Sequence, residues 1–273
     1  MLDIREYVMA GSLEEATSLL EKSPTNRVIG GGCWLRLERR PRGTLVDLSR
    51  LGLDRVEAKD GAVSVGSGCT LRTLERSALL RERFGDCFAG CVDPIVGVQF
   101  RGCATVGGSI YGRFGFSDLC TLFLALGAEA VLYRGGAVPL ETFLKTPRHG
   151  ERDILLSIRI PDDGRRVAFE AFRRTATDLA VLNTAVCRSS ENTWRVAVGA
   201  RPAVAALALR AGELLSLGDD PAQAARTAAQ ELRFGDNLRG SGEYRRALCE
   251  VLTARCVEQL TSMEPNGWRR TAE

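Results

Sequence analysis

The sequence predicts an α+β protein built from two domains. Its 273 residues can form one large domain or two modest ones, and a content of 45% apolar and 26% charged residues is ordinary for a globular chain. The polar, turn-forming stretch Pro161-Asp162-Asp163-Gly164 is the best candidate boundary, because three strand patterns and then three helix patterns follow it. We therefore expect domains at residues 1–164 and 165–267, with a tail at 268–273.

Residue spacing predicts the elements of the first domain. Ser12 and Glu15 stand three residues apart, as in a capping box, so a helix is expected over 12–22. Asp60-Gly61 lies between two short apolar runs and favours a hairpin turn. The other predicted elements are strands at 27–29, 44–48, 56–58, 63–65, 128–133 and 154–160, and helices from Thr70, from Ser117 or Asp118, and over 139–143.

The second domain is expected to pack helices on a three-stranded sheet. Alternating or continuous apolar runs predict its strands at 167–172, 181–187 and 194–198. Longer runs with helical periodicity predict helices at 203–217, 221–232 and 241–260.

Two glycine-rich segments are the main functional signal. VIGGGCWL occupies residues 28–35, directly after a predicted strand, and ATVGGSI occupies residues 104–110. Glycine lacks a Cβ, so phosphate oxygens can approach the backbone N–H groups, and consecutive N–H groups form an anion-binding nest. Each segment alone is more typical of a turn, and neither fits G-x-G-x-x-G or G-x-x-x-x-G-K-[ST]. Together they favour two loops that clasp a diphosphate, and a dinucleotide held outside those motifs points to FAD.

Composition excludes several other kinds of function. The net charge of +3 gives no reason to expect nucleic acid or an acidic membrane as a partner. No apolar run approaches a membrane span of roughly 20 residues and no secretory signal opens the chain, so a cytoplasmic protein is expected. The nine cysteines include no C-x-x-C pair, and their one cluster (Cys87, Cys91, Cys103) is more typical of reduced thiols than of a metal or iron–sulfur site. The single histidine, His149, lies in a turn-like stretch, and no catalytic or metal-binding residue is predicted.

Several stretches resemble, in the same order, the FAD-binding medium subunit of molybdenum hydroxylases, the group that includes xanthine dehydrogenase, carbon monoxide dehydrogenase and nicotinate dehydrogenase. They are VIGGGCWL with TLVDLSRL, VQFRGCATVGGSI, FGFSDLCTLFLALGAEAVL, VPLETFL, DILLSIRIP, FEAFRRTATDLAVLNTAV and FGDNLRGSGEYRRALCEVLTARCV. The resemblance implies an FAD domain of the PCMH, or vanillyl-alcohol-oxidase-like, type with subdomains at about 1–50 and 51–164, and a smaller C-terminal domain at 165–267.

The resemblance also implies electron relay within a heterotrimer. A molybdenum-cofactor subunit would oxidise the substrate, and a [2Fe-2S] subunit would pass the electrons to FAD on this chain. NAD+ or another acceptor would then take them up. The protein's task would be to hold and tune the cofactor, whose own chemistry carries the reaction.

Each matching residue acquires an implied role. Asp118 matches an acidic residue on the flavin side of the cofactor, or it caps a helix. Leu155, which alternation places on the face opposite Leu156, matches a position packed on the flavin ring, or it belongs to the core. Arg173 matches a cation near the flavin carbonyls, or it is a surface charge. The residues assigned to FAD are Val28, Ile29, Gly30, Gly31, Gly32, Cys33, Trp34, Leu35, Ala104, Thr105, Val106, Gly107, Gly108, Ser109, Asp118, Leu155, Arg173, Asp178 and Leu179.

The chain departs from the family pattern at both glycine segments. Cys33 and Trp34 stand where threonine and an acidic residue are usual, and Ser109 stands where asparagine is usual. Trp34 either stacks on an aromatic ring or fills space, and Arg101 either positions the second segment or is a surface charge. Two alternatives therefore stay open. One is a free-standing flavin reductase similar to UDP-N-acetylenolpyruvoylglucosamine reductase, and the other is a scaffold subunit that has lost FAD.

Overall fold

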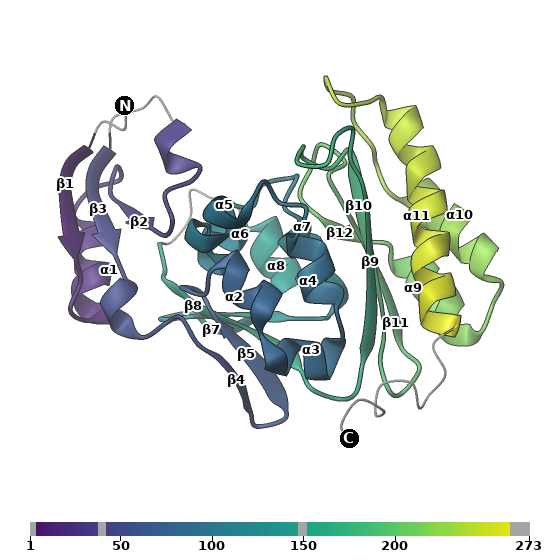
Figure 1. Cartoon of the computed structure of the whole chain (residues 1–273), viewed down its shortest axis with the longest axis horizontal. Coiled ribbons are helices and arrows are strands. Elements are labelled where there is room, and N and C mark those ends of the chain that lie inside the picture. The colour runs from purple at the N-terminus through teal and green to yellow at the C-terminus, as the bar shows by residue number, and fades with distance from the viewer. Residues whose placement is uncertain (1–3, 38–41, 147–151, 263–273) are drawn as a thin grey trace.

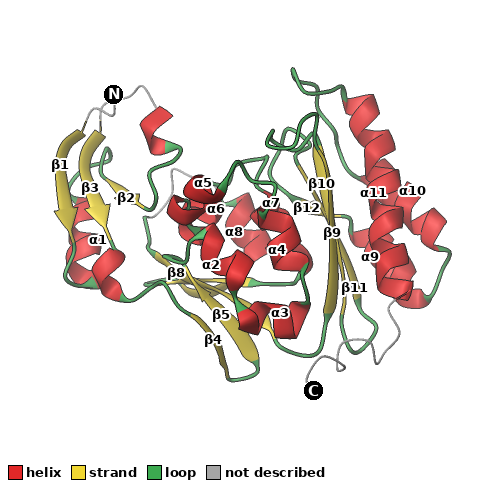
Figure 2. Ribbon diagram, viewed as in Figure 1, coloured by secondary structure: helices red, strands yellow, loops and turns green. Residues whose placement is uncertain are grey.

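The computed structural model describes residues 4–37, 42–146 and 152–262, and it shows three β-sheets that follow one another along the chain (Figures 1 and 2). His149 and the predicted tail at 268–273 lie outside these residues. Helices cover one or the other face of each sheet, so the predicted α+β fold is confirmed. Within the described ranges, no helix combines the length and apolar character that crossing a membrane requires.

The first sheet is small and parallel. Its strands β1 (Ile4–Met9), β3 (Arg42–Asp47) and β2 (Arg27–Ile29) lie in that order, and helix α1 (Leu13–Glu21) packs on it. The Ser12 side chain accepts the Glu15 backbone N–H at 3.1 Å, as the capping-box spacing predicts. Strand β2 ends at Ile29, so the first glycine segment leaves the sheet at its carboxyl edge.

The second sheet is antiparallel, with the strand order β4-β5-β8-β6-β7, and carries a group of short helices on one face (Figure 1). Asp60 and Gly61 both have positive φ in the turn between β4 and β5, which confirms the predicted hairpin. The strands are β4 (Val56–Lys59), β5 (Ala62–Gly66), β6 (Glu129–Leu132), β7 (Gly136–Pro139) and β8 (Leu155–Pro161). The helices are α2 (Leu71–Arg76), α3 (Ala78–Phe84), α4 (Cys87–Val92), α5 (Val98–Cys103), α6 (Val106–Tyr111), α7 (Asp118–Ala125) and α8 (Leu140–Lys145), and 3₁₀ turns η1 (Leu35–Leu37) and η2 (Ser49–Leu51) precede this sheet.

Two local predictions in this part of the chain are wrong. The single helix expected from Thr70 is two helices, because the backbone at Ser77 is extended and its side chain caps α3 by accepting the Leu80 N–H at 3.3 Å. The second glycine segment, at residues 104–110, was expected to be a loop, but most of it belongs to helix α6. The second glycine segment is therefore the first turn of a helix, with Thr105 as its N-cap.

The third sheet has four strands, not the three predicted. Its order is β12 (Ala206–Leu207), β11 (Trp194–Gly199), β10 (Leu182–Arg188) and β9 (Arg166–Phe172), all antiparallel. The short β12 pairs with the edge of β11, so the helix expected from residue 203 begins only at α9 (Leu209–Leu217). With α10 (Pro221–Glu231) and α11 (Gly242–Ser262), α9 covers the outer face of this sheet (Figure 1).

Helix α7 lies between the second and third sheets. All eight of its residues are buried, because one side packs on the other short helices and the opposite side packs on β10 and β11. This double burial explains why the stretch from residue 118 to 126 is apolar almost without a break. Its one acidic residue, Asp118, is thereby placed at the junction between the two sheets.

Candidate cofactor site

The structure brings the two glycine segments into direct contact. A Cβ added to Gly31 would lie 1.7 Å from the carbonyl oxygen of Cys103, and one added to Gly30 would lie 2.3 Å from the Thr105 Oγ1 atom. Neither distance is compatible with a real side chain, so only glycine allows the backbone of the first segment to lie against the start of the second. The two segments, about 70 residues apart in sequence, form one junction.

The second segment does not offer the row of free N–H groups expected of it. The N–H of Val106 donates to the Cys69 carbonyl at 2.8 Å, and the N–H of Gly107 donates to the Ser67 carbonyl at 2.7 Å. The Gly108 N–H donates to Thr105 Oγ1 at 3.1 Å, as in an ordinary helix cap. Because the protein already satisfies these donors, this segment supplies a hydroxyl and a close packing surface instead of a nest.

The first segment differs in this respect. The N–H groups of residues 30–34 donate to no acceptor within the part of the chain that the structure describes. Gly32 has a φ of 67°, which turns the chain in the left-handed region that favours glycine. The Cys33 thiol next to it is half-buried, and burial raises its pKa, so it is a neutral group at this turn. Donors for an anion therefore come mainly from the first segment.

Three aromatic rings stand beside the junction. The Trp34 ring lies 5.5 Å from the Phe114 ring and 4.9 Å from the Phe116 ring, centroid to centroid, and the two phenylalanine rings are stacked 5.2 Å apart. The Trp34 ring plane is tilted by 45° and 51° against these two rings, so Trp34 packs against aromatic rings within the protein and stacks on neither of them. This cluster joins the first segment to the chain that follows α6 and fixes the position of both.

The second group of predicted residues meets where α7 touches the third sheet. Asp118 is only 5% exposed, and its carboxylate accepts from the Arg173 guanidinium at 2.7 Å and from the Asn183 amide at 2.6 Å. The Thr121 hydroxyl donates to the Asn183 carbonyl oxygen at 2.8 Å. Burial raises the pKa of Asp118, and the adjacent Arg173 cation opposes this shift without cancelling it.

These contacts exclude one of the two alternative roles of Asp118 and one of the two of Arg173. Asp118 is not the helix cap, because Ser117 accepts the Cys120 N–H at 3.3 Å in that role. Arg173 is not a surface charge, because its side chain is 9% exposed and ion-paired with Asp118. Both carboxylate oxygens of Asp118 have protein partners, so any contact with a cofactor would have to share them.

Asp178 and Leu179 shape the turn that follows β9. The Asp178 carboxylate accepts the Leu179 N–H at 2.7 Å, and the Asp178 carbonyl accepts from Arg173 at 3.0 Å. The Asp178 side chain also pairs with Arg239 at 3.4 Å. The turn therefore binds the Arg173 guanidinium at Nη1, while Asp118 binds it at Nη2.

The predicted outward orientation of Leu155 is wrong. Its side chain is 4% exposed and belongs to the central hydrophobic cluster. The pairing register between β6 and β8 shifts between Val131 and Leu132, and this bulge breaks the simple alternation along β8. Leu156 packs instead against the cluster beneath the first sheet. The contact with the flavin ring that the resemblance implied for Leu155 has little exposed surface to support it.

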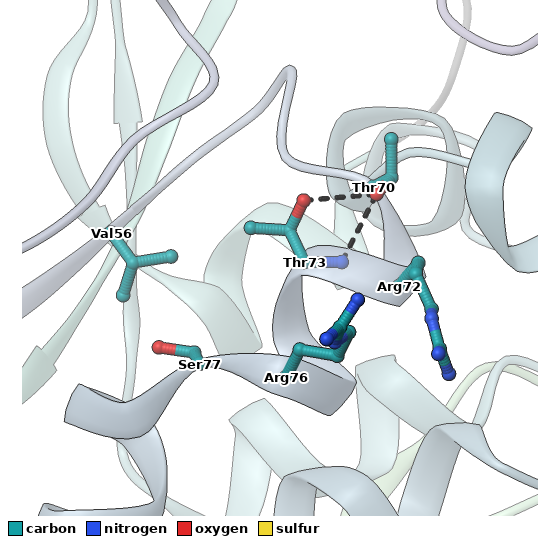
Figure 3. Close-up of a pocket in the computed structure, with 6 residues that line it drawn as sticks. All are labelled: Val56, Thr70, Arg72, Thr73, Arg76 and Ser77. Atoms are coloured by element: carbon teal, nitrogen blue, oxygen red, sulfur yellow. Dashed lines mark hydrogen bonds between the residues drawn. The ribbon is translucent and has the colours of Figure 1, made fainter.

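Two hollows lie near these groups. A cleft of about 500 Å³ is lined by Gly90 and Pro94 on one side and by residues 169–176 on the other, so Arg173 borders it. Figure 3 shows a second, open pocket of about 520 Å³ beside α2, lined by hydroxyl groups, Val56 and the guanidinium groups of Arg72 and Arg76. None of the predicted site residues lines this second pocket. Arg173 lines the first cleft, so that cleft belongs to the candidate site.

Sequence reasoning missed Asn183, which donates to the Asp118 carboxylate, and Thr121, which donates to Asn183. A signal existed for Asn183, since an amide in the middle of a continuous apolar strand must find a buried partner. The three clustered cysteines lie on two helices and differ in exposure: Cys87 and Cys91 are on α4, with Cys91 buried, and Cys103 is exposed on α5. Among the described residues, no group of three or more His, Cys, Asp or Glu side chains is placed to hold a metal ion.

Comparison with known proteins identifies two family domains along the chain. Residues 2–163 match the family described as the FAD binding domain in molybdopterin dehydrogenase, and residues 167–260 match the CO dehydrogenase flavoprotein C-terminal domain. The uncharacterized protein YgfM of Escherichia coli K12 is 28% identical, over 92% of this chain and 94% of that protein. The xanthine dehydrogenase FAD-binding subunit of Escherichia coli O157:H7 is 26% identical, over 69% of this chain and 70% of that subunit.

A solved structure shows the same fold. The carbon monoxide dehydrogenase from Hydrogenophaga pseudoflava contains a chain that superposes with a TM-score of 0.85 at 24% identity, covering 94% of this chain and 97% of that one. The first family match spans more than half of the residues, and its order along the chain agrees with the resemblance read from the sequence. The chain therefore belongs to the family of FAD-binding domains of molybdopterin dehydrogenases, as an oxidoreductase subunit whose cofactor is FAD.

Proposed function

We propose that this chain is the electron-relay subunit of a cytoplasmic molybdenum hydroxylase. When bound, FAD would accept electrons from a [2Fe-2S] cluster and deliver them to NAD+ or another acceptor. A molybdenum-cofactor subunit and a [2Fe-2S] subunit are the proposed partners, in a heterotrimer. The substrate of the molybdenum subunit would not touch this chain.

The contact between the two glycine segments carries the proposal. Gly30 and Gly31 lie against Cys103 and Thr105 with no space for a side chain, so this contact requires glycine at both positions. The N–H groups of residues 30–34, which donate to no acceptor among the described residues, are available there to a phosphate oxygen. Thr105 Oγ1 accepts the Gly108 N–H, and a hydroxyl keeps one proton to donate. These donors fit a diphosphate.

The proposed clasp is asymmetric. Most of its N–H donors come from the first segment, and the second contributes the Thr105 hydroxyl and a flat backbone surface. This division explains how Cys33 and Trp34 can replace the usual family residues, because the donors are backbone groups that do not depend on side-chain identity.

The other end of the site supports a ring near Arg173. Helix α5 has six residues and is about 9 Å long. Its last residue, Cys103, lies at the junction, and its first residue, Val98, follows four residues after Pro94, which borders the cleft. A cofactor with its diphosphate at the junction can therefore extend along α5 to the cleft that Arg173 borders. A guanidinium there would favour negative charge on a bound ring. Asp118 holds that guanidinium, and the Asn183 amide in turn donates to Asp118, across the contact between α7 and the third sheet.

The first test is the visible absorption spectrum of the purified chain, with the released cofactor identified by mass. We expect flavin absorption bands and the mass of FAD, at one flavin per chain. A protein that stays colourless after FAD is added would refute cofactor binding and favour the scaffold alternative.

Electron relay needs a separate test. The chain would be co-expressed with its molybdenum and [2Fe-2S] partners, and flavin bleaching would be followed anaerobically on addition of the hydroxylase substrate. We expect bleaching by substrate and recovery of colour on addition of NAD+ or another acceptor. Flavin that is bound but not bleached through the partners would refute the relay. Turnover of enolpyruvyl-UDP-N-acetylglucosamine by the chain alone would favour the flavin reductase instead.

A further inference from the structure

The open pocket beside α2 is lined almost entirely by hydrogen-bond donors (Figure 3). Its volume of about 520 Å³ is typical of a site for a small molecule. Val56 of β4 is its one apolar lining residue, and the polar lining comes from residues 70–77 at α2 and at the start of α3. No acidic side chain is among the described residues that line it. The lining therefore has a positive charge.

The two cations of the pocket lie on one helix face. Arg72 and Arg76 are four residues apart on α2, and like charges at this spacing destabilise a helix. An anion bound between them would relieve that repulsion. Arg76 is exposed and has no hydrogen-bond or ion-pair partner among the described residues. Its guanidinium donors are therefore available to a ligand.

The carboxylate that pairs with Arg72 is shared with a second arginine. Glu75 accepts from Arg72 and also from the Arg101 Nε atom at 2.8 Å. Arg101 is only 5% exposed, and its guanidinium also donates to the Asp93 carbonyl at 2.6 Å. Arg101 is therefore not a surface charge, and its side-chain contacts do not reach the second glycine segment. Because Glu75 serves two guanidinium groups, it neutralises Arg72 only in part.

The hydroxyl groups of the pocket add further donors. Ser77 Oγ accepts the Leu80 N–H at 3.3 Å and keeps its own proton to donate. The hydroxyl oxygens of Thr70 and Thr73 are 2.9 Å apart, so one donates to the other and one proton of the pair stays free (Figure 3). A carboxylate has two acceptor oxygens, whereas a phosphate monoester has three. Two guanidinium groups and two free hydroxyl protons therefore favour a phosphate group.

We propose that this pocket binds the phosphate group of a small phosphorylated molecule, held by Arg72 and Arg76 with the hydroxyl groups beside them. The organic part of the ligand would contact Val56, the apolar side of the pocket. The site is separate from the clasp proposed for the FAD diphosphate, because residues 30–34 and Thr105 do not line it. The inference therefore goes beyond the proposed function and does not depend on it.

The test is calorimetric titration of the protein with glycerol 3-phosphate, inorganic phosphate and glycerol, each in the presence of saturating FAD. Thr70 forms a β-bridge with Thr105, so FAD is needed to keep the probes out of the neighbouring clasp. We expect one site per chain for glycerol 3-phosphate and for inorganic phosphate, and no binding of glycerol. Arg72→Met and Arg76→Met should each weaken both phosphate probes by about tenfold or more, because each removes a charge-assisted hydrogen bond.

Two further variants make the result specific to the pocket. Arg81→Met is the matched control, since Arg81 is exposed on α3, pairs with Asp86 and does not line the pocket. It should leave the affinity for both phosphate probes within about twofold of wild type, because exposed charges outside the site are screened. Arg76→Lys keeps the charge and should bind the phosphate probes more tightly than Arg76→Met. Arg76 has no partner among the described residues to lose, so its variants should remain folded, as urea denaturation would show.

The outcomes separate this inference from the proposed function. Phosphate affinity unchanged in both Arg72→Met and Arg76→Met would overturn the inference, as would absence of binding up to about 10 mM of either phosphate probe. An equal loss in Arg81→Met would also overturn it, because it indicates attraction by overall charge. A protein that binds no FAD but loses phosphate affinity in Arg76→Met would overturn the proposed function and support the pocket.

Discussion

Adding one methyl group at Gly31 should separate the two glycine segments. The Cβ of Gly31→Ala would lie 1.7 Å from the Cys103 carbonyl oxygen and 2.3 Å from its carbonyl carbon. Both neighbours are backbone atoms, so no side-chain rotation can relieve the overlap. Non-bonded heavy atoms rest about 3.5 Å apart, so the segments must move by about 2 Å.

That displacement sets the expected magnitude. A misplacement of about 1 Å in an organised site costs on the order of 100-fold, so FAD affinity should fall by about 100-fold or more, or about 2.7 kcal/mol. Overpacking should also lower the free energy of unfolding by about 1–3 kcal/mol. The loss of affinity should exceed the loss expected from stability alone, because the chain remains folded.

The assay is titration of the apoprotein with FAD, followed by flavin fluorescence, beside urea denaturation of the same sample. Gly102→Ala is the matched control, because a Cβ at Gly102 meets nothing within 4 Å and alanine favours the helical conformation of α5. Gly102→Ala should bind FAD like the wild type and be equally or more stable. FAD affinity of Gly31→Ala within threefold of wild type would refute the idea that this contact shapes the site.

Three other variants test separate features of the structure. Thr105→Ala removes the cap of α6, so it should lower the free energy of unfolding by about 1 kcal/mol and weaken FAD binding. Thr105→Ser keeps the hydroxyl and should keep both the stability and the FAD affinity. Urea denaturation and FAD titration measure the two effects. Asp118→Asn tests the raised pKa of Asp118. Above about pH 4 the unfolded chain has lost the Asp118 proton, whereas the folded protein still binds it. The stability of the wild type relative to Asp118→Asn should therefore fall as the pH rises from about 4 through the raised pKa. A relative rise in thermal midpoint over that range would show that the ion pair with Arg173 outweighs burial. Arg245→Met removes a fully buried guanidinium that bonds the Val181 carbonyl at 2.9 Å and the Gly235 carbonyl at 2.7 Å, and should cost about 3 kcal/mol or more in urea denaturation. Loss of less than about 1 kcal/mol would show that water replaces these bonds.

Local signals in the sequence predicted the elements that depend on a few neighbouring residues. The cap at Ser12 and the turn at Asp60-Gly61 are examples, because each needs only side-chain or backbone properties within four residues. The break at Ser77 was missed although Ser77 has a capping side chain, because Leu74 and Ala78 continue the apolar spacing across it. The fold class and the family could be predicted because several such stretches occur in a characteristic order.

Contacts between distant residues decided the rest of the site. Ser67 and Cys69 saturate the N–H groups of the second glycine segment, and no pattern within residues 104–110 reveals those acceptors. Leu155 became a core residue through a bulge in its pairing with β6. Arg101 is a buried cation because it pairs with Glu75, which lies 26 residues earlier in the chain.

The sequence by itself therefore determined which residues are flexible, apolar or charged, and from their order the fold class, the family and FAD as the cofactor. Only the tertiary structure decided which glycines are required for space, which backbone donors remain free, and that Asp118 is held by Arg173 and Asn183. The physical reason is that free hydrogen-bond donors and close backbone contacts are properties of pairs of segments. A single stretch of sequence contains only one member of each pair.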